Sequence, residues 1–208
     1  MNRADSRAPR AGNTFDKYGS DDPLVRRVMA GFFRGLDGLW AQAGAPESVL
    51  DVGCGEGVIT RAGARRLGAA PVVGLDVNDP RLAAEWSKAG EPNLEFRTGD
   101  AHDLPFDDDA FDLVASIEML EQAGDPDRVL AELCRVARRA VIVSVPREPV
   151  WQALNLASGR YVRALGNSPA TRNHWSRGAF VDLVGRHARV EAVRTPVPWT
   201  LVLARPRG

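Results

Sequence analysis

A short segment near position 50 alternates glycine with other residues directly after an aspartate. Residues 49–57 read VLDVGCGEG, and residues 58–67 follow without a helix-breaking residue. The apolar start predicts a buried strand, the glycines a tight turn, and the residues after them a helix. Glycine is needed where a backbone must approach a ligand closely or adopt positive φ. The segment therefore predicts a ligand-binding turn.

The spacing of the glycines and the acid before them indicate the charge of the ligand. A dinucleotide-binding turn follows the pattern G-x-G-x-x-G. Here Val58 occupies the place of the third glycine, and Gly57 comes one residue early. Asp51 stands at the end of the strand, where it would face the phosphates of a dinucleotide. An acid at that place favours a ligand that carries positive charge.

The motif D-x-G-x-G-x-G, made by Asp51, Gly53, Gly55 and Gly57, resembles the first motif of the class I S-adenosylmethionine-dependent methyltransferases. The cofactor of that family carries an ammonium and a sulfonium group and no phosphate. Residues 99–106, GDAHDLPF, resemble the G-D-A-x-x-L-P-F block of the same family. The resemblance covers residues 48–146 and is closest to the methyltransferase type 11 group, which includes ubiquinone- and menaquinone-biosynthesis-like enzymes.

Acidic residues also follow the next three expected strands. Asp76 ends the strand expected at 71–77, Asp100 follows the one at 94–98, and Glu118 follows the one at 111–116. An acid at the end of the second strand of such a unit is placed to accept hydrogen bonds from ribose hydroxyls. Because the carboxyl ends of parallel strands meet at one edge of a sheet, these acids and Asp51 are expected to lie together.

Strands and helices alternate regularly up to a fifth strand at 140–145, which predicts a doubly wound parallel sheet. Further helices are expected at 23–42, 79–89, 125–138 and 176–185, and two last strands at 189–194 and 199–204. The resemblance implies a Rossmann-like α/β fold with a mostly parallel seven-stranded sheet in the order 3-2-1-4-5-7-6. It also implies an N-terminal helix and a helical insertion after strand five.

The resemblance implies a cofactor-binding role for ten residues. Asp51 and the turn glycines would hold the methionine end, Asp76 the ribose, and Asp100 with Ala101 the adenine. Ile117 and Glu118 would lie beside the methionine portion. The complete set is Asp51, Gly53, Gly55, Gly57, Asp76, Val77, Asp100, Ala101, Ile117 and Glu118.

Two regions could cover an acceptor. Tyr18, before the first helix, could line a lid or only fix that helix to the core. Residues 147–173 carry apolar side chains at helical spacing, and they could form a lid over the site or an amphipathic helix packed on the domain. The substrate-contacting candidates are Tyr18, Trp151, Tyr161 and Trp175, although such aromatic residues usually belong to a core.

His174 is the candidate general base, because it precedes a helix and follows the expected lid, although a lone histidine is more often structural. Gln122 occupies a position at which the family often has histidine, and its amide cannot take a proton at neutral pH. His102 and His187 are expected to take no part in the site. Asp107 to Asp109 form a solvated turn more readily than a metal site, so no metal is expected.

The composition is that of an ordinary globular protein, with 208 residues, 44% hydrophobic content and zero formal net charge. Residues 1–14 are expected to be a disordered tail and 15–208 one methyltransferase domain, with the lid at 147–175. The charge gives no reason to expect nucleic acid as a partner, and no apolar run approaches the roughly 20 residues of a membrane span. Two cysteines indicate reduced thiols in a cytoplasmic protein, expected to be a monomer or homodimer.

The sequence therefore predicts S-adenosylmethionine-dependent methyl transfer to an oxygen, nitrogen or carbon nucleophile of a small-molecule acceptor. One alternative is a non-catalytic S-adenosylmethionine-binding partner subunit, which the glutamine at position 122 motivates. A less favoured alternative is a nicotinamide-dependent oxidoreductase, because the glycine spacing and the block at 99–106 differ from the dinucleotide pattern.

Overall fold

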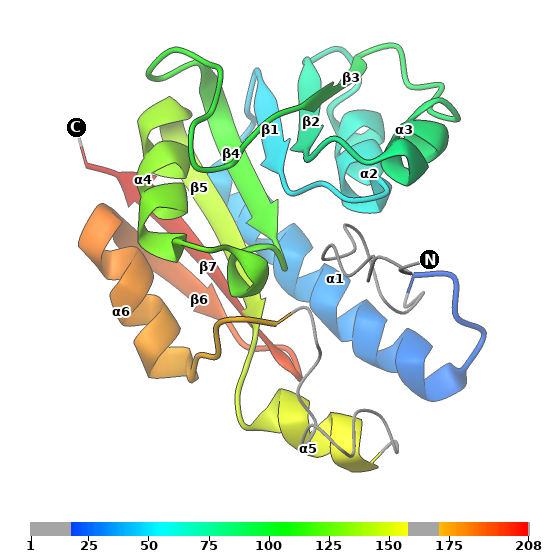
Figure 1. The fold of residues 1–208 in the computed structure, drawn as a ribbon, viewed down its shortest axis with the longest axis vertical. Coiled ribbons are helices and arrows are strands. Elements are labelled where there is room, and N and C mark those ends of the chain that lie inside the picture. The colour runs from blue at the N-terminus through cyan, green and yellow to red at the C-terminus, as the bar shows by residue number, and fades with distance from the viewer. Residues whose placement is uncertain (1–17, 158–170, 208) are drawn as a thin grey trace, which may run out of the picture.

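The computed structural model describes residues 18–157 and 171–207, and within them the chain forms one seven-stranded sheet (Figure 1). The strands are β1 (Val49–Val52), β2 (Val72–Asp76), β3 (Leu94–Thr98), β4 (Phe111–Ile117), β5 (Ala137–Pro146), β6 (Ala188–Arg194) and β7 (Trp199–Pro206). Their order is β3-β2-β1-β4-β5-β7-β6, which confirms the predicted topology. Strands β1 to β5 are parallel, and β7 is antiparallel to both of its neighbours.

Aspartate followed by proline starts three of the helices. The helices are α1 (Pro23–Ala43), α2 (Val58–Leu67), α3 (Pro80–Trp86), the 3₁₀ turn η1 (Leu120–Gln122), α4 (Pro126–Val136), α5 (Val150–Ala157) and α6 (Arg177–His187). Asp22, Asp79 and Asp125 each accept a backbone N–H of the first turn, ahead of a proline at the first helical positions. Proline suits that place because no intrahelical partner is lost there. These caps fix where α1, α3 and α4 begin.

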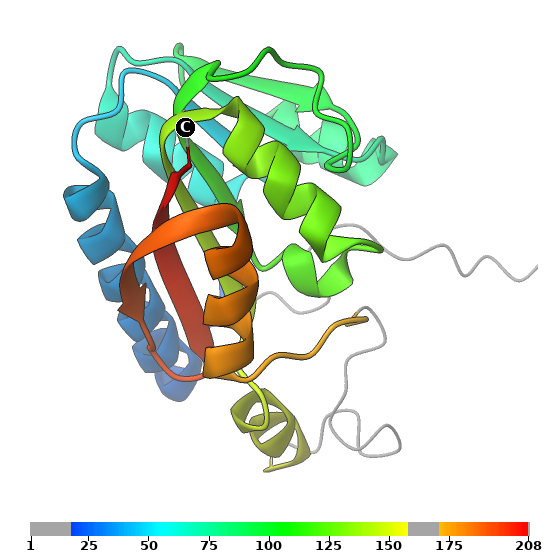
Figure 2. The same ribbon diagram turned by 90° about the vertical axis from the view of Figure 1, so that its left-hand side faces the viewer.

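Helices cover both faces of the sheet (Figure 2). Side chains of α1 and α2 pack on one face, with Phe32 and Leu39 of α1 fully buried. Side chains of α4 and α6 pack on the other, with Leu133 and Phe180 fully buried. Every residue of β4 is buried, as expected of a central strand covered on both faces. The carboxyl ends of β1 to β4 are thus held rigidly at one edge.

Some element boundaries differ from the sequence expectation. The helix expected to end at position 138 ends at Val136, because the chain passes directly into β5 at Ala137. The helix expected at 79–89 ends at Trp86, and α6 continues to His187. Of the apolar stripe expected after β5, α5 covers Val150–Ala157.

The predicted tail at 1–14 and Tyr161 lie outside the described residues, so the predicted division into tail, domain and lid stays a prediction. Within the described ranges, no helix is long and apolar enough to cross a membrane.

Candidate functional site

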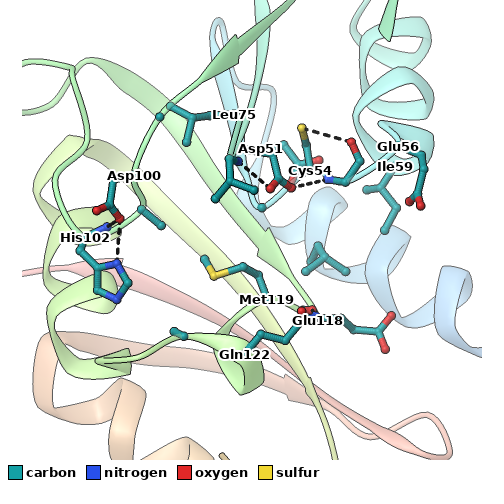
Figure 3. Close-up of a pocket in the computed structure, with 18 of the residues that line it drawn as sticks. Asp51, Cys54, Glu56, Ile59, Leu75, Asp100, His102, Glu118, Met119 and Gln122 are labelled. Carbon is teal, nitrogen blue, oxygen red and sulfur yellow. Dashed lines mark hydrogen bonds and ion pairs between the residues drawn. The ribbon is translucent and has the colours of Figure 1, made fainter. Parts of the chain in front are cut away.

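A cavity of about 400 Å³ opens at the carboxyl ends of the parallel strands (Figure 3). Its walls come from the turn after β1, the end of β2, the loop after β3, the segment from the end of β4 through η1, and two separate residues, Tyr18 and Arg172. In the close-up, Asp100 and His102 form one side and Asp51, Cys54 and Glu56 the opposite side. Ligands of doubly wound sheets bind at this edge.

The turn after β1 requires its glycines. Gly53, Gly55 and Gly57 have φ values of +75°, +53° and +78°, which side chains rarely adopt. A Cβ on Gly53 would lie 2.4 Å from Cγ of Met119, and one on Gly57 would lie 2.5 Å from Cζ of Phe96. The turn is therefore both conformationally special and tightly packed.

Hydrogen bonds fix this turn to β2. The N–H groups of Gly53 and Cys54 donate to the carbonyl of Leu75 at 2.8 and 3.2 Å. The N–H of Gly55 donates to Oδ2 of Asp76 at 2.7 Å. The turn therefore keeps one fixed relation to the acid at the end of the neighbouring strand.

Asp51 is a buried carboxylate in the cavity wall. It is 4% exposed, and the Thr60 hydroxyl donates a hydrogen bond to its Oδ2 at 2.7 Å. Burial, together with the charge of Asp76, raises its pKa to about 6, although the hydrogen bond from Thr60 acts in the opposite direction. A buried carboxylate of this kind favours a cation, because a positive group would offset the cost of burying its charge.

Asp76 lies at the end of β2, and each of its carboxylate oxygens accepts a hydrogen bond from a backbone N–H. Its Oδ2 accepts from Gly55 and its Oδ1 from the N–H of Val77, each at 2.7 Å. Burial raises its pKa, while the two N–H groups act in the opposite direction. A carboxylate offers about four acceptor positions, so capacity remains for hydroxyl donors.

Asp100 is held by His102. The backbone N–H of His102 donates to Asp100 Oδ1 at 2.9 Å, and the ring Nδ1 lies 2.7 Å from the same oxygen. These two bonds lower the pKa of Asp100. The ring Nε2 accepts the N–H of Asp125 at 3.3 Å, so the tautomer that satisfies both contacts is neutral and protonated on Nδ1.

Glu118 has a backbone conformation that is unusual for its type. Its φ is +57°, and its Oε1 accepts a hydrogen bond from Nε1 of Trp199 in β7 at 2.6 Å. Strained residues outside glycine persist where surrounding structure determines them, and they cluster at functional sites. Tyr18 lies nearby, and burial together with the charges of Glu118 and Asp51 raises the pKa of its phenol.

The structure brings most of the predicted cofactor-binding residues together. All of that set line the cavity except Gly57, which starts α2 and packs against the ring of Phe96. Cys54, Met119, His102 and Arg172 also line it and were absent from the predicted set. Cys54 and Met119 are chain neighbours of predicted residues, whereas no sequence motif pointed to Arg172. His102 was expected to take no part, and its place in the wall corrects that expectation.

The predicted substrate and catalytic residues lie mostly elsewhere. Tyr18 lines the cavity, but the described lining contains neither Trp151 nor Trp175. The Trp151 ring centroid lies 6.3 Å from that of Trp199, within the core under α1. Trp175 packs on the opposite core, on Phe180 of α6. His174 is also absent from the lining, and its Nδ1 lies 3.3 Å from Oε1 of Glu148.

The charge of the wall is strongly negative. The described lining holds one guanidinium, on Arg172, against five carboxylates, those of Asp51, Glu56, Asp76, Asp100 and Glu118. Such a set of hydrogen-bond acceptors fits S-adenosylmethionine, which presents positive charge, hydroxyls and an amino group, and no phosphate. It does not fit the pyrophosphate of a dinucleotide.

Comparison with known proteins gives the same assignment. Residues 50–145 match the family described as methyltransferase domain. A phthiotriol/phenolphthiotriol dimycocerosates methyltransferase of Mycobacterium tuberculosis is 38% identical over 92 residues, which are 44% of this chain and 34% of that protein. Ajmaline N-methyltransferase of Rauvolfia serpentina is 32% identical over 133 residues, which are 59% of this chain and 45% of that protein. The chain thus aligns with less than half the length of these curated relatives.

The crystal structure of a SAM-dependent methyltransferase from Aquifex aeolicus superposes with a TM-score of 0.66, covering 82% of this chain and 89% of that one at 20% identity. At that identity the likeness shows the fold. The family match, which spans the motif-bearing strands, and the acid-lined cavity at their ends agree with it. Residues 50–145 are therefore similar to a methyltransferase domain, on a fold shared with a SAM-dependent methyltransferase of known structure.

Proposed function

We propose that this protein transfers the methyl group of S-adenosylmethionine to an oxygen, nitrogen or carbon nucleophile of a small-molecule acceptor. The observation that carries the proposal is the set of acids Asp51, Asp76 and Asp100, which surround one cavity beside a glycine turn. The cofactor supplies a methyl group that its bond to positively charged sulfur makes electrophilic.

Each acid has a distinct proposed role. Asp51 binds the ammonium group of the methionine end, because its buried carboxylate is most easily kept ionised by a neighbouring cation. Asp76, already oriented by two backbone N–H groups, accepts the ribose hydroxyls. Asp100, oriented by His102, accepts the adenine amino group beside the backbone of Ala101. Ile117 and Glu118 border the methionine portion.

The described lining offers the acceptor alignment, and no histidine in it is available as a base. His102 is the one histidine of the described lining, and both of its ring nitrogens hydrogen-bond within the protein. Gln122 lines the cavity and cannot take a proton at neutral pH. Orientation of two reactants can account for several kcal/mol of the barrier, about 7 or more in favourable systems. His174 as a base stays a prediction.

The alternative of a partner subunit that binds the cofactor without turnover is favoured by one observation, the same lack of an available histidine in the described lining. The two functions share the cofactor site and differ in whether methyl transfer occurs. A monomeric or homodimeric state and a cytoplasmic location stay predictions from the sequence.

The cofactor is tested by isothermal titration of the purified protein with S-adenosylmethionine, S-adenosylhomocysteine and NADH. We expect the two sulfur ligands to bind at micromolar concentration and NADH not to bind. Asp76→Ala should weaken binding about tenfold or more, because it removes acceptors for two hydroxyls. The matched control is Asp37→Ala, an exposed acid on α1 paired with Arg66. Equal losses in the two variants, or binding of NADH alone, would refute the assignment.

Catalysis is tested by incubating the protein with methyl-labelled S-adenosylmethionine and pools of small metabolites. Label in an acceptor supports the enzymatic function. Cofactor binding without transfer to any pool would instead support the partner-subunit function.

A further inference from the structure

The strongest feature outside the cavity is Trp86, the last residue of α3. It does not appear in the cavity lining, yet its indole Nε1 donates a hydrogen bond to the carbonyl of Gly55 at 2.8 Å. We propose that Trp86 is a positioning residue for cofactor binding. From outside the cavity, it holds the glycine turn at residues 53–57 in the conformation that binds the cofactor. The inference rests on the proposed function and concerns a residue that no motif of the resemblance includes.

Both backbone polar atoms of Gly55 are bound from outside the turn. Its carbonyl accepts from Trp86 and also, within the turn, from Sγ of Cys54 at 3.8 Å, and its N–H donates to Asp76 at 2.7 Å. Gly55 has a φ of +53°, and glycine populates many other conformations with little cost. Because no Cβ restricts this residue, its conformation depends on such hydrogen bonds, and those to Trp86 and Asp76 are the two shorter ones.

The indole is itself held in place. Trp86 stacks on Phe96 of β3, with ring centroids 5.1 Å apart and planes only 4° from parallel. The Phe96 ring fits against two glycines: a Cβ on Gly57 would lie 2.5 Å from it, and one on Gly74 would lie 2.7 Å from it. The ring pair therefore fills the space between α3, the end of the turn at Gly57 and strand β2 at Gly74, and the indole N–H donates to Gly55.

Trp86 and Asp76 therefore act on the same residue. If Gly55 left its present conformation, Asp76 would lose one of its two backbone donors and the orientation that they impose. Ligand binding would then include the cost of restoring the turn, whereas a preorganised turn avoids that cost. The expected signature is an effect of Trp86 on cofactor affinity that depends on Asp76.

The first test replaces Trp86 with Phe, which keeps an aromatic ring to stack and removes the N–H donor. The control is Trp40→Phe on α1, a buried tryptophan that packs near Gly63 and away from the turn. Titration with S-adenosylhomocysteine should give a dissociation constant about three- to tenfold higher for Trp86→Phe and unchanged for Trp40→Phe. Unliganded melting temperatures should fall by similar amounts in both variants.

A double-mutant cycle with Asp76→Asn separates positioning from general weakening. We expect the Trp86→Phe effect on the dissociation constant to shrink to less than twofold in the Asp76→Asn background, because both side chains act through Gly55. Additive effects, or wild-type affinity in Trp86→Phe, would overturn the inference. If the wild-type protein itself fails to bind S-adenosylhomocysteine, the proposed function fails, which is a different result.

Discussion

Replacing Asp51 with Asn should stabilise the protein without ligand while weakening its cofactor site. Asp51 is 4% exposed, and the charge of Asp76 at the end of β2 disfavours its ionisation. Asn has nearly the same shape and can still accept the hydrogen bond from Thr60, but it carries no charge to bury. The change in the free energy of unfolding therefore measures what it costs to bury an ionised carboxylate in the cavity wall when no ligand is bound.

The magnitude follows from the pKa of Asp51, which burial raises from an ordinary value of 3.8 to about 6. Above pH 6 Asp51 is ionised in the folded state, where burial disfavours its charge. The difference between its two pKa values corresponds to a loss of stability of about 3 kcal/mol at most. Between pH 6 and pH 4 the folded state binds more protons than the unfolded state. The penalty therefore disappears as the pH falls through that window.

The assay is urea unfolding of both proteins at several pH values from 4.5 to 8. We expect Asp51→Asn to raise the free energy of unfolding by about 1 to 3 kcal/mol at pH 7.5, with the difference shrinking as the pH approaches 4.5. The control is Asp112→Asn, since Asp112 is equally buried but the backbone N–H of Glu47 and the guanidinium groups of Arg138 and Arg139 outweigh burial and lower its pKa. That variant should lose stability. A destabilised or pH-independent Asp51→Asn would refute the reasoning.

Two further predictions concern the glycine turn and the pH dependence of binding. Gly57→Ala should cost more stability than Gly68→Ala, by about 1 to 3 kcal/mol in urea unfolding, because both glycines have positive φ but only Gly57 is crowded by Phe96. Equal costs would show that crowding at Phe96 is negligible. Titration should show S-adenosylhomocysteine binding tightening as the pH rises through about 6, where Asp51 ionises. The same profile in Asp51→Asn would assign it to another group.

The strand topology and the convergence of the strand-end acids could be predicted because their signals are local. A glycine turn and an acid at a strand end are encoded within a few residues, and parallel strands bring such ends together without any knowledge of side-chain packing. Asp51, Asp76, Asp100 and Glu118 accordingly meet around one cavity.

The surroundings of Trp151 and Trp175 could not be predicted, because the path of the chain after β5 decides them. Trp151 and Trp175 looked like substrate contacts, yet each packs into a different core on opposite faces of the sheet. The surroundings of His102 also depend on where α4 docks, since its ring Nε2 accepts the N–H of Asp125 at the start of that helix. Trp86 had no motif, since its contact with Gly55 joins residues 31 positions apart. Long-range contacts of this kind leave no periodicity in a single sequence.

The hydrogen bond between Glu118 and Trp199 also bears on the order in which the protein matures during synthesis. The motif blocks at 51–57 and 99–106 and the acid Glu118 all precede residue 123, but the Glu118 carboxylate accepts a hydrogen bond from a strand that is made 81 positions later. A ribosome-bound chain can therefore display every motif and still lack a finished cavity wall. Because a ligand stabilises only the state that binds it, the cofactor would act late, and it would favour chains whose β7 has already entered the sheet.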